Sequence, residues 1–331
     1  MAFEKVNASH PDKCADRIAG ALVDYCYSKE HDPRCAFEVL IGHGLTTIIG
    51  ETSVMVPYKE VVAIVERIIG KQDKIVLHQV PQDPILAHNQ DGVLRAADNG
   101  IFRGCAPTHE QKLLTSLAHT IYGAFPTDGK YVIQTKNDYD RNNQGQKIAD
   151  VDNHEDGQRR LSPTDERNLQ RDERTGGTMG EYLVTICQSH LSREQEPELR
   201  QMLKEAYNVH LPTINPLGEW TGGPDVDTGA TNRKLGSDMG DSVTGGGLMG
   251  KDLSKADVSV NTACFLRAQH SGQTVTAACA IGDRDVTFTY GDGHSETQSF
   301  SEIVEQSRLY ILTVGGFERF AEWGLIRHKD V

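Results

Sequence analysis

Residues 245–255 read GGGLMGKDLSK, and this glycine-rich stretch is the most informative part of the chain. Its glycines leave backbone N–H groups unshielded and permit positive φ angles, so that successive N–H groups can converge on an anion. Lys251 and Lys255 follow one helical turn apart and supply charges that reach phosphate oxygens. The stretch therefore predicts a loop that binds a polyphosphate, for which the tail of a nucleotide is the natural ligand.

The spacing from Gly245 to Gly250 and Lys251 also matches the first seven positions of a P-loop. However, Asp252 stands where Ser or Thr would bind Mg²⁺, and the preceding MGDSVT is polar rather than a buried strand. Two other interpretations of this segment stay open at this point. One is a true P-loop, which these departures weaken, and the other is a glycine-rich surface loop without a ligand.

The composition limits the class of protein. The 331 residues exceed a typical single core, which predicts two or three domains. A net charge of −13 argues against binding to nucleic acid or to an anionic membrane. No apolar run approaches the roughly 20 residues of a membrane span, and the first residues lack the apolar core of a signal peptide. The seven cysteines form no C-x-x-C pair, so we expect reduced thiols in a cytoplasmic protein.

Helical and strand patterns alternate along the chain about three times, which predicts mixed α/β layers. Residues 80–100 show little periodicity and are expected to form a long loop, which is either functional or disordered. The polar stretch 137–180 is expected to be an exposed or mobile insertion. We expect helices at about 11–28, 58–69, 108–122, 193–207, 254–269 and 299–313, and strands at 35–41, 45–54, 74–79, 131–136, 181–187, 273–281 and 285–291.

Two further polar motifs carry groups suited to a charged ligand. His10-Pro11-Asp12-Lys13 places a carboxylate and a lysine at a helix start, where a metal and a phosphate can be held together. Taken alone, this motif is more often a capped surface helix. Residues 223–234, GPDVDTGATNRK, set two carboxylates and an Arg-Lys pair on a glycine-containing path, for which an ordinary acidic turn is an equal alternative.

Three carboxylates elsewhere extend this pattern. Asp257 lies two residues beyond Lys255 at a helix start and would complete a Mg²⁺ pair with Asp12. Glu38 and Glu51 interrupt apolar strands, and each either faces solvent by alternation or is buried and paired. Together, the motifs describe a site for a polyanion, a divalent metal and a cationic group.

These motifs occur in the order found in S-adenosylmethionine synthetases, and the chain resembles that family over most of residues 1–135 and 181–290. Each motif is weak alone, but five in register are very specific. They are His10-Pro11-Asp12-Lys13, Gly50-Glu51, Ile214-Asn215-Pro216, residues 222–234 and residues 245–257.

The resemblance implies an α/β fold (α+β layered) of three similar β/α domains about a pseudo-threefold axis. We place approximate, interleaved units at 1–107, 108–210 and 211–331. The resemblance also implies a homodimer whose active sites lie at the subunit interface. The insertion and the short C-terminal end have no clear counterpart in the family, so assembly beyond a dimer is not expected.

The resemblance further implies synthesis of S-adenosylmethionine from ATP and L-methionine. In the family, the methionine sulfur attacks the 5′ carbon of ATP, and the displaced triphosphate is hydrolysed to phosphate and diphosphate. A thioether has no proton to remove, so the reaction needs no general base. It needs in-line alignment and stabilisation of the leaving group. The implied cofactors are Mg²⁺, two per site, and K⁺.

Roles are carried over from the family residue by residue. His10 is expected to polarise the bridging oxygen of the leaving triphosphate, Asp12 and Asp257 to bind Mg²⁺, and Glu38 to accompany K⁺. Groups expected to bind the polyphosphate are Lys13, Lys130, Arg233, Lys234, Gly245, Gly246, Gly247, Lys251 and Lys255. Groups expected to contact methionine or the nucleoside are Glu51, Gln82, Asp98, Asp128, Trp220, Asp227 and Ile281.

Three departures from the family pattern carry expectations of their own. Trp220 stands where the family has a phenylalanine that stacks on adenine, so wider stacking is expected. Thr244 replaces a histidine before the glycines, which predicts weaker hydrolysis of triphosphate. The loop from Gln82 to Ala97 is short, which predicts looser selectivity for methionine. The alternatives to synthesis are a P-loop-like kinase or NTPase and a catalytically silent ATP-binding relative.

Overall fold

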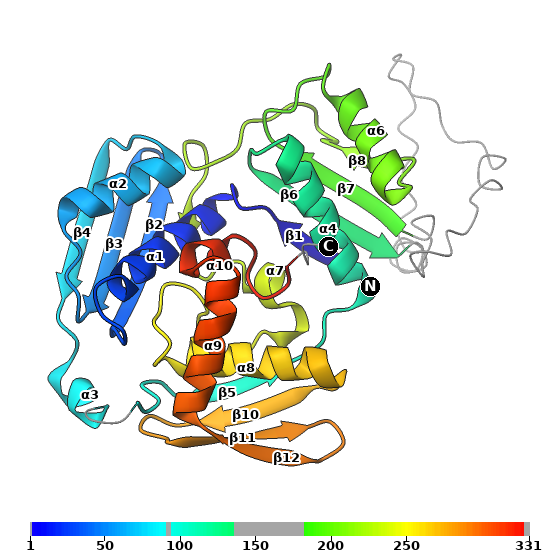
Figure 1. The fold of residues 1–331 in the computed structure, drawn as a ribbon. Helices are drawn as coiled ribbons and strands as arrows, with labels where there is room; N and C mark the ends of the chain where they lie inside the picture. Colours follow the sequence, from blue (N-terminus) through cyan, green and yellow to red (C-terminus); the bar gives the residue numbers. More distant parts are fainter. Residues whose placement is uncertain (1, 91–93, 136–181, 328–331) are drawn as a thin grey trace, which may run out of the picture.

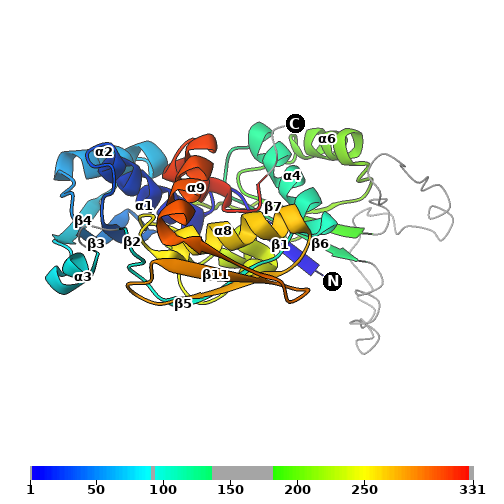
Figure 2. The same cartoon turned by 60° about the horizontal axis from the view of Figure 1, so that its bottom comes forward.

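The computed structural model describes residues 2–90, 94–135 and 182–327. This part of the chain contains three sheets of four strands each, with helices packed against them (Figure 1). Turning the molecule brings most helices to one side and the sheets to the other (Figure 2). The predicted α/β class with three β/α layers is confirmed.

The first sheet has the order β1-β6-β7-β8 and carries two helices. The helix α4 (His109–Ala124) begins at a capping box, in which the Thr108 hydroxyl and the Gln111 side chain satisfy each other's backbone N–H groups. The strands are β1 (Ala2–Val6), β6 (Gly129–Thr135), β7 (Tyr182–Gln188) and β8 (Thr213–Ile214), and the second helix is α6 (Glu196–Tyr207).

The second sheet has the order β4-β3-β2-β9 and packs on α1 (Pro11–Tyr27) and α2 (Tyr58–Ile69). Its hairpin alternates cleanly, because Phe37 and Val39 point into the core while Glu38 and Leu40 face outward. The strands are β2 (Cys35–Gly42), β3 (Leu45–Thr52), β4 (Lys74–Val80) and β9 (Gly229–Ala230).

The third sheet has the order β12-β11-β10-β5, and α8 (Ala256–Ser271) packs on it with α9 (Phe300–Thr313) behind. Its strands are β5 (Gly100–Gly104), β10 (Val275–Cys279), β11 (Asp285–Tyr290) and β12 (Ser295–Ser299). The short elements α3 (Pro84–Asn89), α7 (Leu235–Met239), η3 (Gly240–Ser242) and α10 (Phe317–Trp323) complete the described chain.

Each sheet collects strands from distant parts of the chain, since β1 pairs with β6 and β5 pairs with β10. Domain boundaries therefore cannot be read as simple cuts, and the proposed units stay a prediction. The expected loop at 80–100 contains the helix α3. The expected insertion at 137–180 lies outside the described residues. None of the described helices is long and apolar enough to cross a membrane.

Two buried clusters form the core. The larger one joins the second and third sheets through α1, α8 and α9, and the smaller one lies beneath the first sheet and α4. Lys5 fastens β1 to the end of the chain, because its buried ammonium donates to the carbonyl oxygens of Ser237, Trp323 and Ile326 at 2.7, 3.0 and 2.9 Å. These contacts hold the first strand, α7 and α10 together beside the candidate site.

Candidate active site

Asp12 stands at the start of α1 and organises the first group of predicted site residues. Its side chain is only 2% exposed, and Oδ1 accepts the backbone N–H of Ala230 at 2.9 Å. Arg233 Nη1 lies 3.5 Å from Oδ1 and Lys234 Nζ lies 3.7 Å from Oδ2. The structure therefore brings the His10 motif and the Arg-Lys pair together.

Glu4 extends this group, although it belongs to none of the motifs found in the sequence. Its carboxylate lies 2.7 Å from Lys130 Nζ and 4.0 Å from Lys234 Nζ. The pairing of β1 with β6 brings these residues together from positions far apart in the chain. We call Glu4, His10, Asp12, Lys130, Arg233 and Lys234 the Asp12 cluster.

His10 is held as a neutral hydrogen-bond donor. It caps α1, and its Nδ1 accepts the backbone N–H of Asp12 at 3.2 Å, which leaves the proton on Nε2. Burial lowers the pKa of His10 to about 4; Asp12 opposes this shift, and Lys234 and Lys130 add to it. At neutral pH the imidazole is uncharged and can donate from Nε2 to an oxygen that gains negative charge.

Trp220, Asp128 and Gly222 form a compact group close to this cluster. A Cβ atom on Gly222 would lie 2.6 Å from both Asp128 Oδ2 and Trp220 Cζ3, so only glycine allows this packing. Asp128 Oδ2 accepts the N–H of Gly223 at 3.0 Å, and the Trp220 indole donates to Asn215 at 3.1 Å. Burial raises the pKa of Asp128 to about 6, and Asp227 and Asp12 act in the same direction.

The second group lies around Asp257 at the start of α8. Lys251 Nζ is 2.5 Å from Asp257 Oδ2. Burial raises the pKa of Asp257, Lys251 acts against this shift, and the negative charge of Asp98 adds to it. Gly246 has a φ of 83° and lies directly on the carboxylate, because a Cβ there would be 2.1 Å from Oδ1. We call Asp98, Gly246, Lys251 and Asp257 the Asp257 cluster.

Asp252 explains why the glycine–lysine loop departs from a P-loop. It is fully buried, and its Oδ2 accepts the backbone N–H of Cys35 at 2.8 Å while its own N–H donates to the Cys35 carbonyl oxygen at 3.0 Å. The N–H of Phe37 donates to Gly250 O at 2.7 Å. The loop thus runs along the start of β2, and α8 begins only at Ala256. No strand leads into the loop in this described region, because η3 precedes it.

Asn232, the residue before Arg233, attaches the glycine–lysine loop to α1, and sequence reasoning missed this role. Its Oδ1 accepts the backbone N–H groups of Leu248 and Met249, both at 2.8 Å, and its own N–H donates to Asp16 at 2.8 Å. Its φ is 62°, a value that asparagine tolerates better than most residues. Among the described residues, no hydrogen bond or ion pair links Asp12 to Asp257 directly.

Several predicted residues lie on the outward face of the second sheet or next to it. Glu38 and Glu51 follow the strand alternation and share that face with Leu40 and Ile49, which are 51% and 56% exposed. Thr231 donates to the Glu38 carboxylate, and Glu51 accepts the N–H of Asp83 at 3.0 Å. Gln82, which follows β4, donates to Gln90 at 2.9 Å. The predicted Ile281 lies elsewhere, half-exposed between β10 and β11 of the third sheet.

Two further predicted lysines lie in α1 and directly before α8. Lys13 is fully buried, and its ammonium donates to both oxygens of Asp238 at 2.7 Å and to Asp16 at 3.0 Å. Its three N–H donors are used, so it serves the packing of α1 against α7 rather than a phosphate. Lys255 is the residue before α8, and its charge acts on the buried Asp252.

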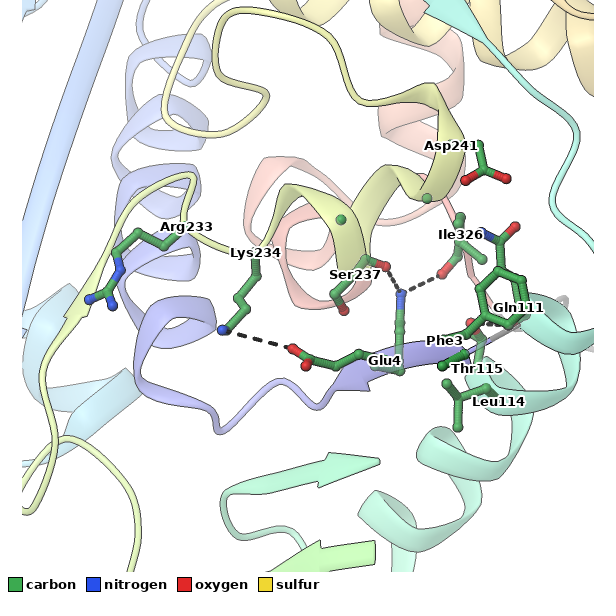
Figure 3. A pocket seen from close by; sticks show the side chains of 14 residues that line it. Phe3, Glu4, Gln111, Leu114, Thr115, Arg233, Lys234, Ser237, Asp241 and Ile326 are labelled. Carbon is green, nitrogen blue, oxygen red and sulfur yellow. Dashed lines mark hydrogen bonds and ion pairs between the residues drawn. The ribbon is translucent and has the colours of Figure 1, made fainter. Parts of the chain in front are cut away.

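A cavity of about 480 Å³ opens between β1, α4 and α7 (Figure 3). Lys234 reaches from its edge to Glu4, and Phe3 and Leu114 supply apolar wall. The cavity adjoins the Asp12 cluster through Arg233 and Lys234. Its described lining contains none of the residues predicted to contact methionine or the nucleoside.

The chain is similar in sequence to known S-adenosylmethionine synthetases. Residues 1–84 match the model of the S-adenosylmethionine synthetase N-terminal domain. The S-adenosylmethionine synthase of Helicobacter pylori strain Shi470 is 28% identical, over 92% of this chain and 83% of the relative. S-adenosylmethionine synthase 1 of Rhodopseudomonas palustris strain BisB18 is 27% identical, over 91% of this chain and 80% of the relative. The predicted resemblance to the S-adenosylmethionine synthetase family is confirmed.

The fold is also that of a solved S-adenosylmethionine synthetase. The structure described as an unusual S-adenosylmethionine synthetase from Campylobacter jejuni superposes with a TM-score of 0.66, over 100% of this chain and 95% of that one. Its sequence is only 16% identical, so this likeness concerns the fold alone. The chain thus has the fold of that synthetase and is similar in sequence to S-adenosylmethionine synthases.

Proposed function

We propose that the chain is a methionine adenosyltransferase, which forms S-adenosylmethionine from ATP and L-methionine. The methionine sulfur attacks the ATP 5′ carbon and displaces triphosphate, which is then hydrolysed to phosphate and diphosphate. The observation that carries this proposal is the Asp12 cluster, in which Arg233, Lys234 and a neutral imidazole lie at the buried Asp12 carboxylate. Lys130 joins the cluster through Glu4, which also lies near Lys234.

The Asp12 cluster suits a leaving group better than a nucleophile. Lys130, Arg233 and Lys234 supply fixed positive charge, which stabilises triphosphate as the carbon–oxygen bond breaks. His10 donates from Nε2 to the bridging oxygen, because its Nδ1 is occupied by the Asp12 N–H. Neither role requires removal of a proton from the attacking sulfur. Lys251 and Lys255 are proposed to complete the polyphosphate site.

The two predicted metal ligands fit a hard divalent cation. Asp12 and Asp257 present carboxylate oxygens, which Mg²⁺ prefers, and Asp98 adds a second carboxyl at Asp257. The Lys251 ammonium already occupies a cation position on Asp257. When bound, Mg²⁺ would neutralise charge on the triphosphate oxygens. We assign K⁺ to the neighbourhood of Glu38, whose carboxylate faces outward beside Thr231.

A second copy of the chain is proposed to complete each site. Glu38 and Glu51 lie on an outward sheet face whose other members include Leu40, Ile49 and Val76, all apolar and exposed. Such a face favours a protein interface. Burying it in a homodimer would bring residues expected to contact methionine against another subunit. The seven cysteines are free thiols, which supports our assignment to the cytoplasm.

Incubation of the protein with ATP, methionine, Mg²⁺ and K⁺ tests the proposal directly. We expect a sulfonium nucleoside in the mass spectrum that depends on both ATP and methionine. A P-loop-like NTPase would instead release phosphate without methionine, and a silent relative would bind ATP without product. The buried Asp252 and the absence of a strand before the described loop disfavour the first of these alternatives.

A further inference from the structure

The Asp257 carboxylate is covered on both oxygens. Lys251 Nζ lies 2.5 Å from Oδ2, and the Gly246 backbone lies against Oδ1. The side chain of Asp257 is 6% exposed, and that of Lys251 is 17% exposed. A metal ion cannot reach this carboxylate until Lys251 or Gly246 moves away.

The end of the glycine–lysine loop, residues 248–250, is held too firmly by hydrogen bonds to move together with the Lys251 side chain or Gly246. Leu248 and Met249 are buried and both donate to Asn232, while Gly250 O accepts from Phe37. The backbone of Lys251 bridges to Ala36. The freedom that remains lies in the Lys251 side chain, a flexible four-carbon stem, and in the exposed glycines 245–246.

We propose that Lys251 and the divalent cation bind Asp257 alternately. In the ligand-free protein the ammonium takes the cation position, and metal binding displaces it from Asp257, which frees Lys251 for the polyphosphate. Lys251 therefore becomes able to bind the polyphosphate only when the metal ion binds Asp257. The inference rests on the proposed function only in taking a metal–nucleotide as the substrate.

Binding of Mn²⁺ alone to the nucleotide-free, full-length protein tests the exchange. Wild-type protein must lose a charge-assisted hydrogen bond before the metal binds, whereas Lys251→Met does not. We expect Lys251→Met to bind Mn²⁺ about tenfold more tightly, as measured by the loss of the free-Mn²⁺ electron paramagnetic resonance signal. Asp257→Asn and the double variant Lys251→Met/Asp257→Asn should lack this gain.

Lys255→Met is the matched control, because it removes an equal charge four residues away whose side chain is not paired with Asp257. Its Mn²⁺ affinity should stay within about twofold of wild type, as expected when no direct contact is lost. Equal affinity in wild type and Lys251→Met, or the same gain in both lysine variants, would overturn the proposal.

A second measurement needs no variant and so does not depend on how well Lys251→Met folds. Mn²⁺ should raise the rate at which acetic anhydride modifies Lys251 in the wild-type protein, since the freed amine becomes accessible. Peptide mass spectrometry reports this rate beside that of Lys255. An unchanged or slower rate at Lys251 would contradict the exchange. Both measurements omit methionine and turnover, so their outcome is independent of whether the protein makes S-adenosylmethionine.

Discussion

The Asp12 cluster and the Asp257 cluster both place a buried carboxylate beside lysines at the start of a helix, but they differ in the groups that contact the carboxylate. Asp12 lies at the start of a helix and is fixed by the Ala230 N–H, with its cations at 3.5 and 3.7 Å. Asp257 is closed by a glycine loop and by a direct contact to Lys251 at 2.5 Å. The first cluster is ready for a ligand, whereas the second must rearrange to accept one.

The largest effect is expected at His10, in the Asp12 cluster. His10→Ala removes the proposed donor to the leaving oxygen and should lower kcat about 100- to 1,000-fold. His10→Asn keeps a donor and a helix cap and should recover part of the loss. Steady-state kinetics of S-adenosylmethionine formation, with thermal melts to verify folding, measure this. A loss below about threefold in His10→Ala would assign the leaving-group role to the lysines alone.

Asn232 tests how far the two clusters depend on each other. Asn232→Ala leaves two buried N–H groups without an acceptor, which should cost about 1–3 kcal/mol of stability. The detached loop should also lower kcat/KM for ATP about 10- to 100-fold. Urea unfolding and kinetics measure the two effects. Asn232→Asp keeps the acceptor and should be milder; equal damage in both variants would show that the acceptor is not what matters.

Trp220 tests whether the proposed adenine site lies beside the Asp12 cluster. If its ring stacks on adenine, ATP should quench tryptophan fluorescence, and Trp220→Ala should abolish quenching and raise KM for ATP about tenfold. The chain has two tryptophans, and the other, Trp323, is buried against His119. Trp323→Phe is therefore the control and should retain the quenching. Quenching that survives in Trp220→Ala would remove the stacking assignment.

The smallest effect concerns the protonation of His10. Its pKa is lowered from an ordinary value of 6.5 to about 4, mainly by burial. The neutral ring thus contributes stability that is present above pH 6.5 and is lost as the pH falls through about 4. Nitrogen-15 spectra should show a neutral Nε2–H imidazole at pH 7.5 and still at pH 5. A midpoint near 6.5 would contradict the buried, Nδ1-bonded arrangement.

The sequence predicted the longer periodic elements well, including the helix 58–69 and the hairpin strands that begin at Cys35 and Leu45. It missed β1, β5 and β12, which are five residues each and too short for a periodic signal. The contact of Glu4 with Lys130 could not be predicted, because it depends on the pairing of β1 with β6, which lie far apart in the sequence. Asn232 was overlooked for a similar reason, since its acceptor role depends on a loop 16 residues away.

Residue type alone also misplaced Lys13. A lysine after a helix-start aspartate suggested a phosphate contact, yet Asp238, more than 200 residues later, takes its ammonium. For Asp252 the prediction from residue type was correct, because an aspartate at this position argued against a P-loop. The sequence could not show, however, that this aspartate is buried and accepts the backbone N–H of Cys35. The roles of the remaining site residues stay predictions.

The position of bond cleavage in ATP tests the central claim most directly. ATP carrying an ¹⁸O label at the 5′ bridging oxygen should be incubated with the protein, methionine, Mg²⁺ and K⁺, and all products analysed by mass. The account predicts that the label leaves with the triphosphate and is absent from the sulfonium nucleoside. Label retained in a nucleotide product such as ADP, with no methionine-dependent nucleoside, would contradict it.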